Sequence, residues 1–191
     1  MRAGCLLGVP LLLLACGEDP DARGPGSSGD PGGDGEEQAD GAKSDLPDFE
    51  CNPVSADADC SDGWCQIPAG CFVMGSPEEQ RCRDDDVEIQ HKVKLSRDFE
   101  ISATEVTQAQ FEARMGYNPS QFADCGEDCP VERVNWHDAV AYCNALSEAE
   151  GLDACYTCSG ERDERICFAL EDDYDPIQAC PGYRLPTEAE W

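Results

Sequence analysis

Positive charge is scarce in this sequence. Lysine and arginine together number 13, against 41 aspartates and glutamates, so the formal net charge is −28. Proteins that bind nucleic acid gather Lys and Arg against the phosphate groups, and adhesion to anionic lipid through charge needs the same residues. The composition therefore excludes nucleic acid as a partner and a charge-driven membrane contact. We interpret the acidity itself as a source of solubility.

Long apolar runs are also missing. The longest covers residues 5–15, behind the single positive charge of Arg2, and a transmembrane helix needs about 20 apolar residues. This pattern predicts a secretory signal peptide over residues 1–15. The run ends Leu-Leu-Ala-Cys, which resembles the bacterial lipobox. The resemblance implies that Cys16 is lipidated and becomes the new N-terminus; an ordinary cleaved signal with an incidental cysteine is the alternative.

Residues able to form a core are nearly absent from the next segment. Glycine, proline, serine and acidic residues dominate residues 16–50, and such a composition cannot offset the entropy of ordering. We predict a disordered acidic linker that tethers a domain to the membrane through the lipid. Residues 51–63 form a cysteine-containing lead-in, and residues 64–191 form one small domain.

Cysteine is abundant. Twelve of the 14 cysteines remain once Cys5 and Cys16 are set aside, and an even number in an exported domain predicts disulfides. The candidates are Cys51, Cys60, Cys65, Cys71, Cys82, Cys125, Cys129, Cys155, Cys158, Cys167 and Cys180. Their connectivity is open. Some close spacings would also suit zinc or a redox pair, but the irregular gaps and the exported location favour disulfides.

Local patterns predict short strands and capped helices. Alternating apolar residues predict strands over 71–74, 92–95 and 99–101. A capping box at Thr107 predicts a helix that stops at Gly116. A second helix runs from near Asn135 to before Gly151, with an apolar stripe of Trp136, Ala139, Val140, Cys143 and Leu146. A second capping box, at Thr187, begins a third helix.

Four segments resemble the formylglycine-generating enzyme, or sulfatase-modifying factor, family. They are residues 67–76, 99–111, 130–144 and 182–191, in the family's order, and the last, Gly-Tyr-Arg-Leu-Pro-Thr-Glu-Ala-Glu-Trp, is the most specific. The resemblance implies an α+β domain with a C-type-lectin-like fold and little regular secondary structure. Because Trp191 falls inside that signature, we expect residues 64–191 to be the N-terminal portion of a domain truncated at its C-terminal side.

The same resemblance implies several functions. The family includes copper-dependent oxidases that convert a protein cysteine to formylglycine, iron-dependent sulfoxide synthases and non-catalytic binding modules. The oxidases' copper cysteines and calcium ligands follow the signature, so no catalytic or metal-binding residue is carried over to this chain. Copper and structural calcium are expected only of a full-length domain. The hypotheses are an envelope lipoprotein of oxidase ancestry and a lectin-like cell-surface module that binds a protein or a glycan.

Other conspicuous residues have structural interpretations. Cys143 lies on the apolar face of its helix, as a buried thiol or as the partner of a loop cysteine. We expect structural roles for the two histidines and internal or capping roles for the polar signature residues. The residues concerned are His91, His137, Glu105, Glu188, Glu190 and Arg184. Trp136 and Tyr142 are predicted to be core residues, and Asp84–Asp86 a solvated loop.

Overall fold

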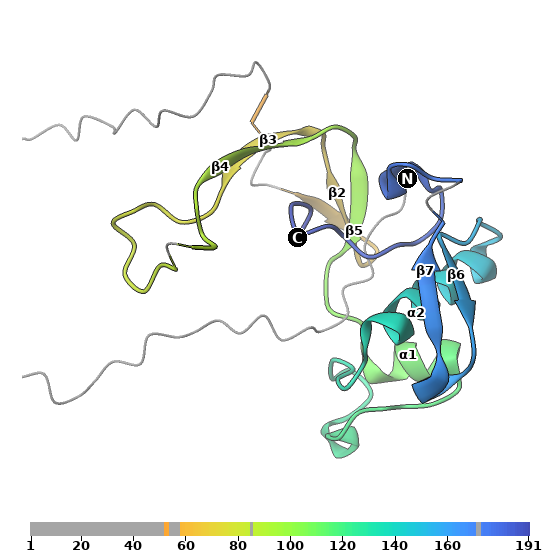
Figure 1. The fold of residues 1–191 in the computed structure, drawn as a ribbon. Coiled ribbons are helices and arrows are strands. Elements are labelled where there is room, and N and C mark those ends of the chain that lie inside the picture. Colours follow the sequence, from red (N-terminus) through yellow and green to blue (C-terminus); the bar gives the residue numbers. More distant parts are fainter. Residues whose placement is uncertain (1–51, 54–57, 85, 171–172) are drawn as a thin grey trace, which may run out of the picture.

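The structure, a computed structural model, describes residues 52–53, 58–84, 86–170 and 173–191 (Figure 1). The predicted signal peptide and linker, together with Cys16, Cys51 and Asp85, lie outside these residues. None of the described residues belongs to a helix with the length and apolar character needed to cross a bilayer.

Within the described ranges, short strands form three small antiparallel sheets. The first has the order β1-β2-β5, and the other two are the pairs β3-β4 and β6-β7. Their bounds are β1 Asp59–Ser61, β2 Trp64–Ile67, β3 Gly70–Met74, β4 His91–Leu95, β5 Phe99–Ser102, β6 Tyr156–Ser159 and β7 Ile166–Ala169. The expected strands at 71–74, 92–95 and 99–101 are present as β3, β4 and β5.

Two α-helices and three short 3₁₀ turns complete the described part of the chain. The helices are α1, Gln108–Met115, and α2, Trp136–Glu150. The 3₁₀ turns are η1 Ala123–Cys125, η2 Arg162–Glu164 and η3 Ile177–Ala179. The mixture of helices and strands, with little regular secondary structure, confirms the α+β class.

Both helices begin and end where capping chemistry predicts. The Thr107 side chain accepts from the Gln110 backbone N–H, and the Gln110 side chain accepts from the Thr107 N–H, which completes a capping box. At α2 the Asn135 side chain accepts from the Asp138 N–H at 2.9 Å. Gly116 and Gly151 close the two helices in the left-handed conformation that glycine adopts without strain.

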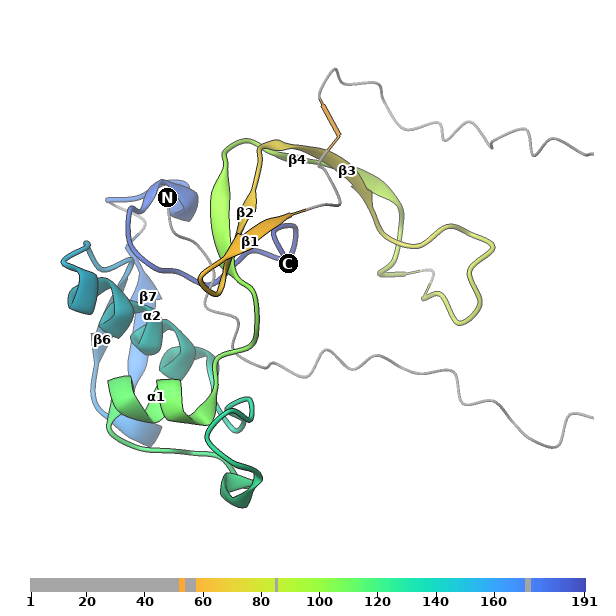
Figure 2. The same ribbon diagram turned by 180° about the vertical axis from the view of Figure 1, so that it is seen from behind.

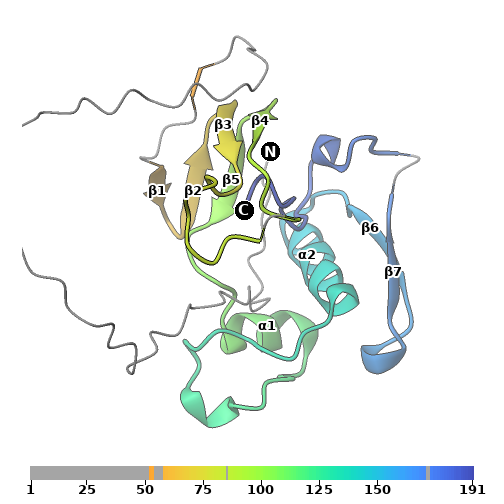
Figure 3. The ribbon, with the colours of Figure 1, turned by 60° about the vertical axis from the view of Figure 1, so that its left-hand side comes forward.

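The main core surrounds α2. Figure 3 shows α2 between the β6-β7 hairpin and the strands of the other two sheets, with α1 packed beside one end of α2. The residues of this core include Val106, Phe111, Val131, Val140, Tyr142, Cys143, Tyr156 and Tyr183. A smaller apolar cluster is centred on Leu95 of β4 and Phe99 of β5. Apolar side chains of β2, β3, β4 and β5 pack against these two residues. The reverse view in Figure 2 shows β3 and β4 as a ribbon that extends away from the helical part.

The signature segment after residue 181 packs directly on α2. Ser147 Oγ accepts from the Tyr183 N–H at 2.8 Å and donates to the Cys143 carbonyl at 3.0 Å. A Cβ at Gly182 would lie 2.0 Å from the Asp153 carbonyl oxygen, so only glycine permits this approach. Tyr183 is 1% exposed and contacts Trp64 with ring centroids 5.4 Å apart.

One prediction about local structure was wrong. Trp136 is not a core residue, because it begins α2 at the surface and is 47% exposed. Tyr142, in contrast, is a core residue, 3% exposed. At Thr187, where a capped helix start is expected, the residues form one hydrogen-bonded turn. The Glu190 side chain accepts from the Thr187 N–H, and the N–H groups of Glu190 and Trp191 donate to the Thr187 carbonyl.

Candidate functional site

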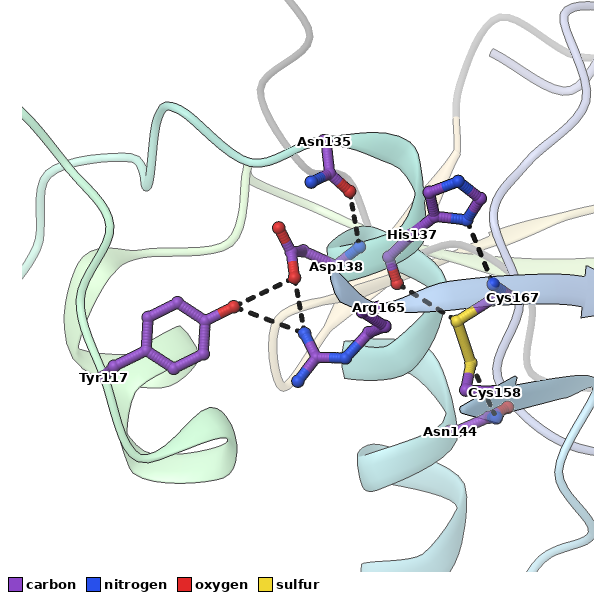
Figure 4. A network of polar contacts seen from close by, with 8 residues as sticks. All are labelled: Tyr117, Asn135, His137, Asp138, Asn144, Cys158, Arg165 and Cys167. Atoms are coloured by element: carbon purple, nitrogen blue, oxygen red, sulfur yellow. Dashed lines mark hydrogen bonds and ion pairs between the residues drawn. A yellow bond between two sulfur atoms is a disulfide. The ribbon is translucent and has the colours of Figure 1, made fainter. Parts of the chain in front are cut away.

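A buried polar network joins α2 to the loop before β7 (Figure 4). Asp138, in the first turn of α2, forms an ion pair with Arg165, and the Tyr117 hydroxyl donates to the same carboxylate oxygen at 3.0 Å. Arg162 lies over the Tyr117 ring, 4.9 Å from its centroid. Burial raises the pKa of the Tyr117 hydroxyl, and the neighbouring Asp138 carboxylate raises it further. The phenol therefore stays protonated at neutral pH and acts as a donor.

Two further side chains of α2 hold the β6-β7 hairpin, as Figure 4 shows in part. The Cys167 N–H donates to His137 Nδ1 at 3.1 Å. Asn144 binds the backbone of Tyr156 in both directions, because its Nδ2 donates to the carbonyl at 2.6 Å and its Oδ1 accepts from the N–H at 3.2 Å. His137 and Asn144 are seven residues apart, so they lie on one face of the helix. This face fixes the hairpin against α2.

Disulfides reinforce the same region. Cys158–Cys167 links β6 to β7, and Cys155–Cys180 links the start of β6 to the end of η3. Two further disulfides, Cys60–Cys65 and Cys125–Cys129, close short loops. Cys71 and Cys82 are also disulfide-bonded. Disulfides at this density are typical of extracytoplasmic proteins.

An open cleft of about 550 Å³ lies beside the clamped hairpin. Three aromatic side chains, of Trp136, Tyr156 and Tyr174, contribute to its wall. The Trp136 ring meets Tyr156 edge-on, with centroids 5.9 Å apart, and meets His137 in the same way at 5.3 Å. Its remaining walls come from Ala169, Asp175, Pro176, Ile177, Gln178, Leu185, Pro186 and Thr187. The polar network and the disulfides therefore hold the aromatic wall in place.

The segment around Arg184 forms the far side of this cleft. Arg184 makes two hydrogen bonds of 2.7 Å to the Glu190 carboxylate, and both side chains are at most 7% exposed. Burial on its own would raise the pKa of Glu190, but the hydrogen bonds from Arg184 and Thr187 outweigh burial and hold it below its ordinary value. Arg184 is thus the internal ion-pair partner that the sequence predicts. It is engaged by Glu190 and does not offer its charge to the cleft.

The other expected residues are not brought together. Among the described cysteines, Cys143 is free, and it is fully buried in α2. His91 lies at the start of β4, far from α2 in sequence and in a different sheet, and its Nδ1 lies 2.9 Å from the Ile89 carbonyl. Glu105 and Glu188 are exposed, and their expected capping role stays a prediction. Glu190 accepts from the Thr187 N–H, as expected of a capping residue, and Gln110 accepts from the Thr107 N–H at the start of α1.

In the acidic loop, the described side chains are not arranged to bind a metal ion. Asp84 and Asp86 are exposed, and the Asp86 N–H donates to the Asp84 side chain at 3.0 Å. Across the described ranges, no three His, Cys, Asp or Glu side chains form a group that could hold a metal ion.

Comparisons with known proteins place the fold. Residues 52–191 match the family described as the sulfatase-modifying factor enzyme 1-like domain. The chain belongs to this family. A curated relative, "Chaperone protein LppX" of Paenibacillus barcinonensis, is 45% identical over 98 residues, which make up 49% of this chain and 34% of the relative. The chain therefore spans about a third of the length of that relative.

A solved structure also resembles this sulfatase-modifying factor domain. It is "Treponema denticola variable protein 1", with 30% sequence identity and a TM-score of 0.46. The similarity covers 66% of this chain and 49% of that one.

Sequence reasoning missed most of the site in this sulfatase-modifying factor domain. The partners Tyr117, Asp138 and Arg165 are up to 48 residues apart, and no local pattern links them. Trp136 carried a signal, because it is the first helical residue after the Asn135 cap, where side chains commonly remain at the surface. Because Trp136 also fits the apolar stripe of the helix, the pattern predicted a buried side chain.

Proposed function

We propose that this protein is a lipid-anchored, extracytoplasmic member of the family whose domain binds a polypeptide partner in the Trp136 cleft. The cleft is the observation that carries the proposal. Nearly half of the Trp136 side chain is exposed within a 550 Å³ opening lined by two tyrosines and two prolines. Tryptophan is enriched at the energetic centres of protein interfaces, since it offers a large rigid surface at low entropic cost.

The outer face of β7, the strand that contributes Ala169 to the cleft, is also apolar. Ile166 and Phe168 alternate with the buried Cys167 along this strand, and they are 50% and 66% exposed. Ala169 lies on the opposite face, with Cys167. Exposed apolar side chains of this size suit a protein partner. The name of the relative, "Chaperone protein LppX", also favours a polypeptide ligand.

The location forms part of the proposal. The disulfides support export, and the lipobox-like end of the signal supports a lipid on Cys16. We propose attachment to the bacterial envelope, at the outer membrane or the cell surface, with the acidic linker as a tether. Labelling of cells with radioactive palmitate tests this, because label should enter the wild-type protein and not Cys16→Ala.

Binding arrays test the function itself. The full chain, exported to an oxidising compartment so that its disulfides form, is applied to a peptide array and to a glycan array. We expect binding to peptides, with affinity for the best peptide weakened roughly thirtyfold by Trp136→Ala, the loss of about 2 kcal/mol typical of a central tryptophan. Phe122→Ala is the matched control, because Phe122 is 66% exposed and lies outside the cleft.

Three results would contradict the proposal. They are binding to glycans only, binding to no peptide, and peptide binding that is equally strong in Trp136→Ala. Circular dichroism and thermal melting of each variant show whether the fold is retained, so that a loss of binding is assigned to the cleft.

Formylglycine formation is the second candidate, and family membership favours it. The family's oxidases bind copper through two cysteines, whereas Cys143 is the one free thiol among the described residues and is buried. These residues do not fit a copper dithiolate, so we assign no reaction step to copper or to structural calcium. Incubation of the chain with copper and a sulfatase peptide should yield no formylglycine; formation of the aldehyde would favour the oxidase.

A further inference from the structure

The one charged side chain that lines the described part of the Trp136 cleft is acidic, and the nearby Arg97 is engaged outside the lining by the Gln178 carbonyl, to which it donates at 3.3 Å. Asp175 is the charged side chain among the described residues that line it, and Asp175 is exposed. Asp173, two residues before it, is also exposed, and the chain has a net charge of −28. No lysine or arginine is among the lining residues. A cation entering the cleft therefore meets an attractive field, whereas an anion is repelled.

The aromatic wall suits the same charge. Electron-rich ring faces attract ammonium and guanidinium groups within about 6 Å of the ring centroid, and tryptophan does so most strongly. Trp136, Tyr156 and Tyr174 supply three rings to the wall. The Tyr174 hydroxyl donates to Asp153 at 3.2 Å, which leaves the ring of Tyr174 fixed by a hydrogen bond at its far end. The methylene stem of a long basic side chain would also bury against Pro176 and Pro186.

Gln178 supplies an acceptor that lacks a donor. Its Oε1 is enclosed and is the one buried side-chain oxygen or nitrogen of the described residues without a hydrogen-bond partner. Leaving such a group unpaired is unfavourable, so a donor that reaches it is bound more tightly. Gln178 lines the cleft and is only partly buried as a residue. Rotation about its side-chain torsions is the movement by which Oε1 would reach a donor in the cleft.

We infer, on the basis of the proposed function, that the partner polypeptide places a lysine or arginine side chain in this cleft. The cation lies against Trp136 and its tyrosine neighbours, Asp175 balances its charge, and Gln178 Oε1 accepts one of its N–H groups. The geometry thus specifies a basic residue as the determinant of recognition, and the adjoining apolar face of Ile166 and Phe168 contacts the residues that flank it.

A host peptide with one variable position tests this inference. The probes are acetyl-Gly-Ser-Pro-Phe-X-Pro-Gly-Ser-amide, where X is lysine, norleucine, arginine, citrulline or glutamate, and binding to the full chain is measured by calorimetry. We expect lysine to bind about tenfold more tightly than norleucine, and arginine more tightly than citrulline, through the cation–π and hydrogen-bond contributions. Both preferences should shrink as salt is added, because salt screens the contribution of Asp175.

Substitutions in the cleft separate the contributions. Gln178→Leu should weaken the lysine peptide about fivefold and leave the norleucine peptide unchanged, because only lysine can donate to Oε1. Asp175→Asn should reduce the preference for lysine over norleucine, and Phe122→Ala should alter neither. Equal affinity for lysine and norleucine, or a preference for glutamate, would overturn the inference while leaving the proposed function intact. Binding of none of the five peptides, together with no array binding, would overturn both.

Discussion

At the scale of single residues, the ion pair between Arg184 and Glu190 does the most to fix the signature segment. Both side chains are almost fully buried, and the two parallel hydrogen bonds of 2.7 Å satisfy two guanidinium nitrogens. Glu190 Oε2 also accepts from the Thr187 N–H and hydroxyl. A buried charge left without its partner is strongly destabilising, so each member requires the other.

Glu190→Gln should therefore destabilise the protein. We expect the free energy of unfolding to fall by about 3 kcal/mol, because the Arg184 guanidinium loses its counter-charge inside the fold. Urea unfolding of the full chain measures the change. Glu188→Gln is the matched control, since Glu188 lies two residues away and is exposed, and a change within about 0.5 kcal/mol is expected of it. Equal effects of the two substitutions would show that the pair does not stabilise the segment.

The same pair predicts a pH dependence. The pKa of Glu190 is lower in the folded protein than its ordinary value, so the folded state favours the carboxylate. Its contribution to stability is complete above the unfolded pKa of about 4.3 and is lost as the pH falls through the folded pKa. The free energy of unfolding is measured at a series of pH values from pH 6 downward. It should fall less steeply with pH in Glu190→Gln than in the wild type. Identical slopes would argue against the assignment.

At the scale of elements, α2 organises everything that borders the cleft. His137 and Asn144 hold the hairpin, Asp138 holds the loop before β7, and Ser147 holds the signature segment. The helix presents these contacts at successive turns, so one element positions both the hairpin with its loop and the signature segment. These contacts fix the positions of the residues that form the cleft wall.

The Cys155–Cys180 disulfide should stabilise the domain more than Cys125–Cys129. Its sequence separation is 25 residues against 4, and loop-closure entropy predicts contributions of about 3.5 and 2 kcal/mol. Paired replacement by alanine, followed by urea unfolding, measures both. The first replacement also empties two sites that are 0% and 2% exposed, which adds to its cost. A larger effect at Cys125–Cys129 would contradict this ranking.

The elements differ in how well the sequence predicted them. Helix α1 and helix α2 follow from capping residues and a terminal glycine, which act over a few positions. The β1-β2 hairpin has a local sequence signal in the dipeptide Asp62-Gly63. Both residues adopt the positive φ angles of a tight hairpin turn. The β6-β7 hairpin had no such signal. It depends on cysteine pairing and on contacts with α2, and neither connectivity nor long-range contact can be read from spacing alone.

At the scale of the whole molecule, the domain is built from one large core around α2 and one small cluster under the first two sheets. Family membership, shown over residues 52–191, agrees with the four motifs because each occupies a structural position. Gly182 and Tyr183 pack against α2, and Thr107 and Asn135 cap the two helices. Two of the motifs also contribute to the cleft, because Trp136, Leu185, Pro186 and Thr187 line it.

The most direct test of the account follows the indole N–H of Trp136 by nuclear magnetic resonance. The chain has three tryptophans, so the full-length ¹⁵N-labelled protein should give three indole signals, and Trp136→Phe identifies one of them. On titration with the lysine host peptide, the Trp136 signal should move progressively and saturate, while Trp64 and Trp191 stay near their positions. A Trp136 signal that does not move at saturating peptide, or one that moves only together with all the others, would contradict the assignment of this cleft as the binding site.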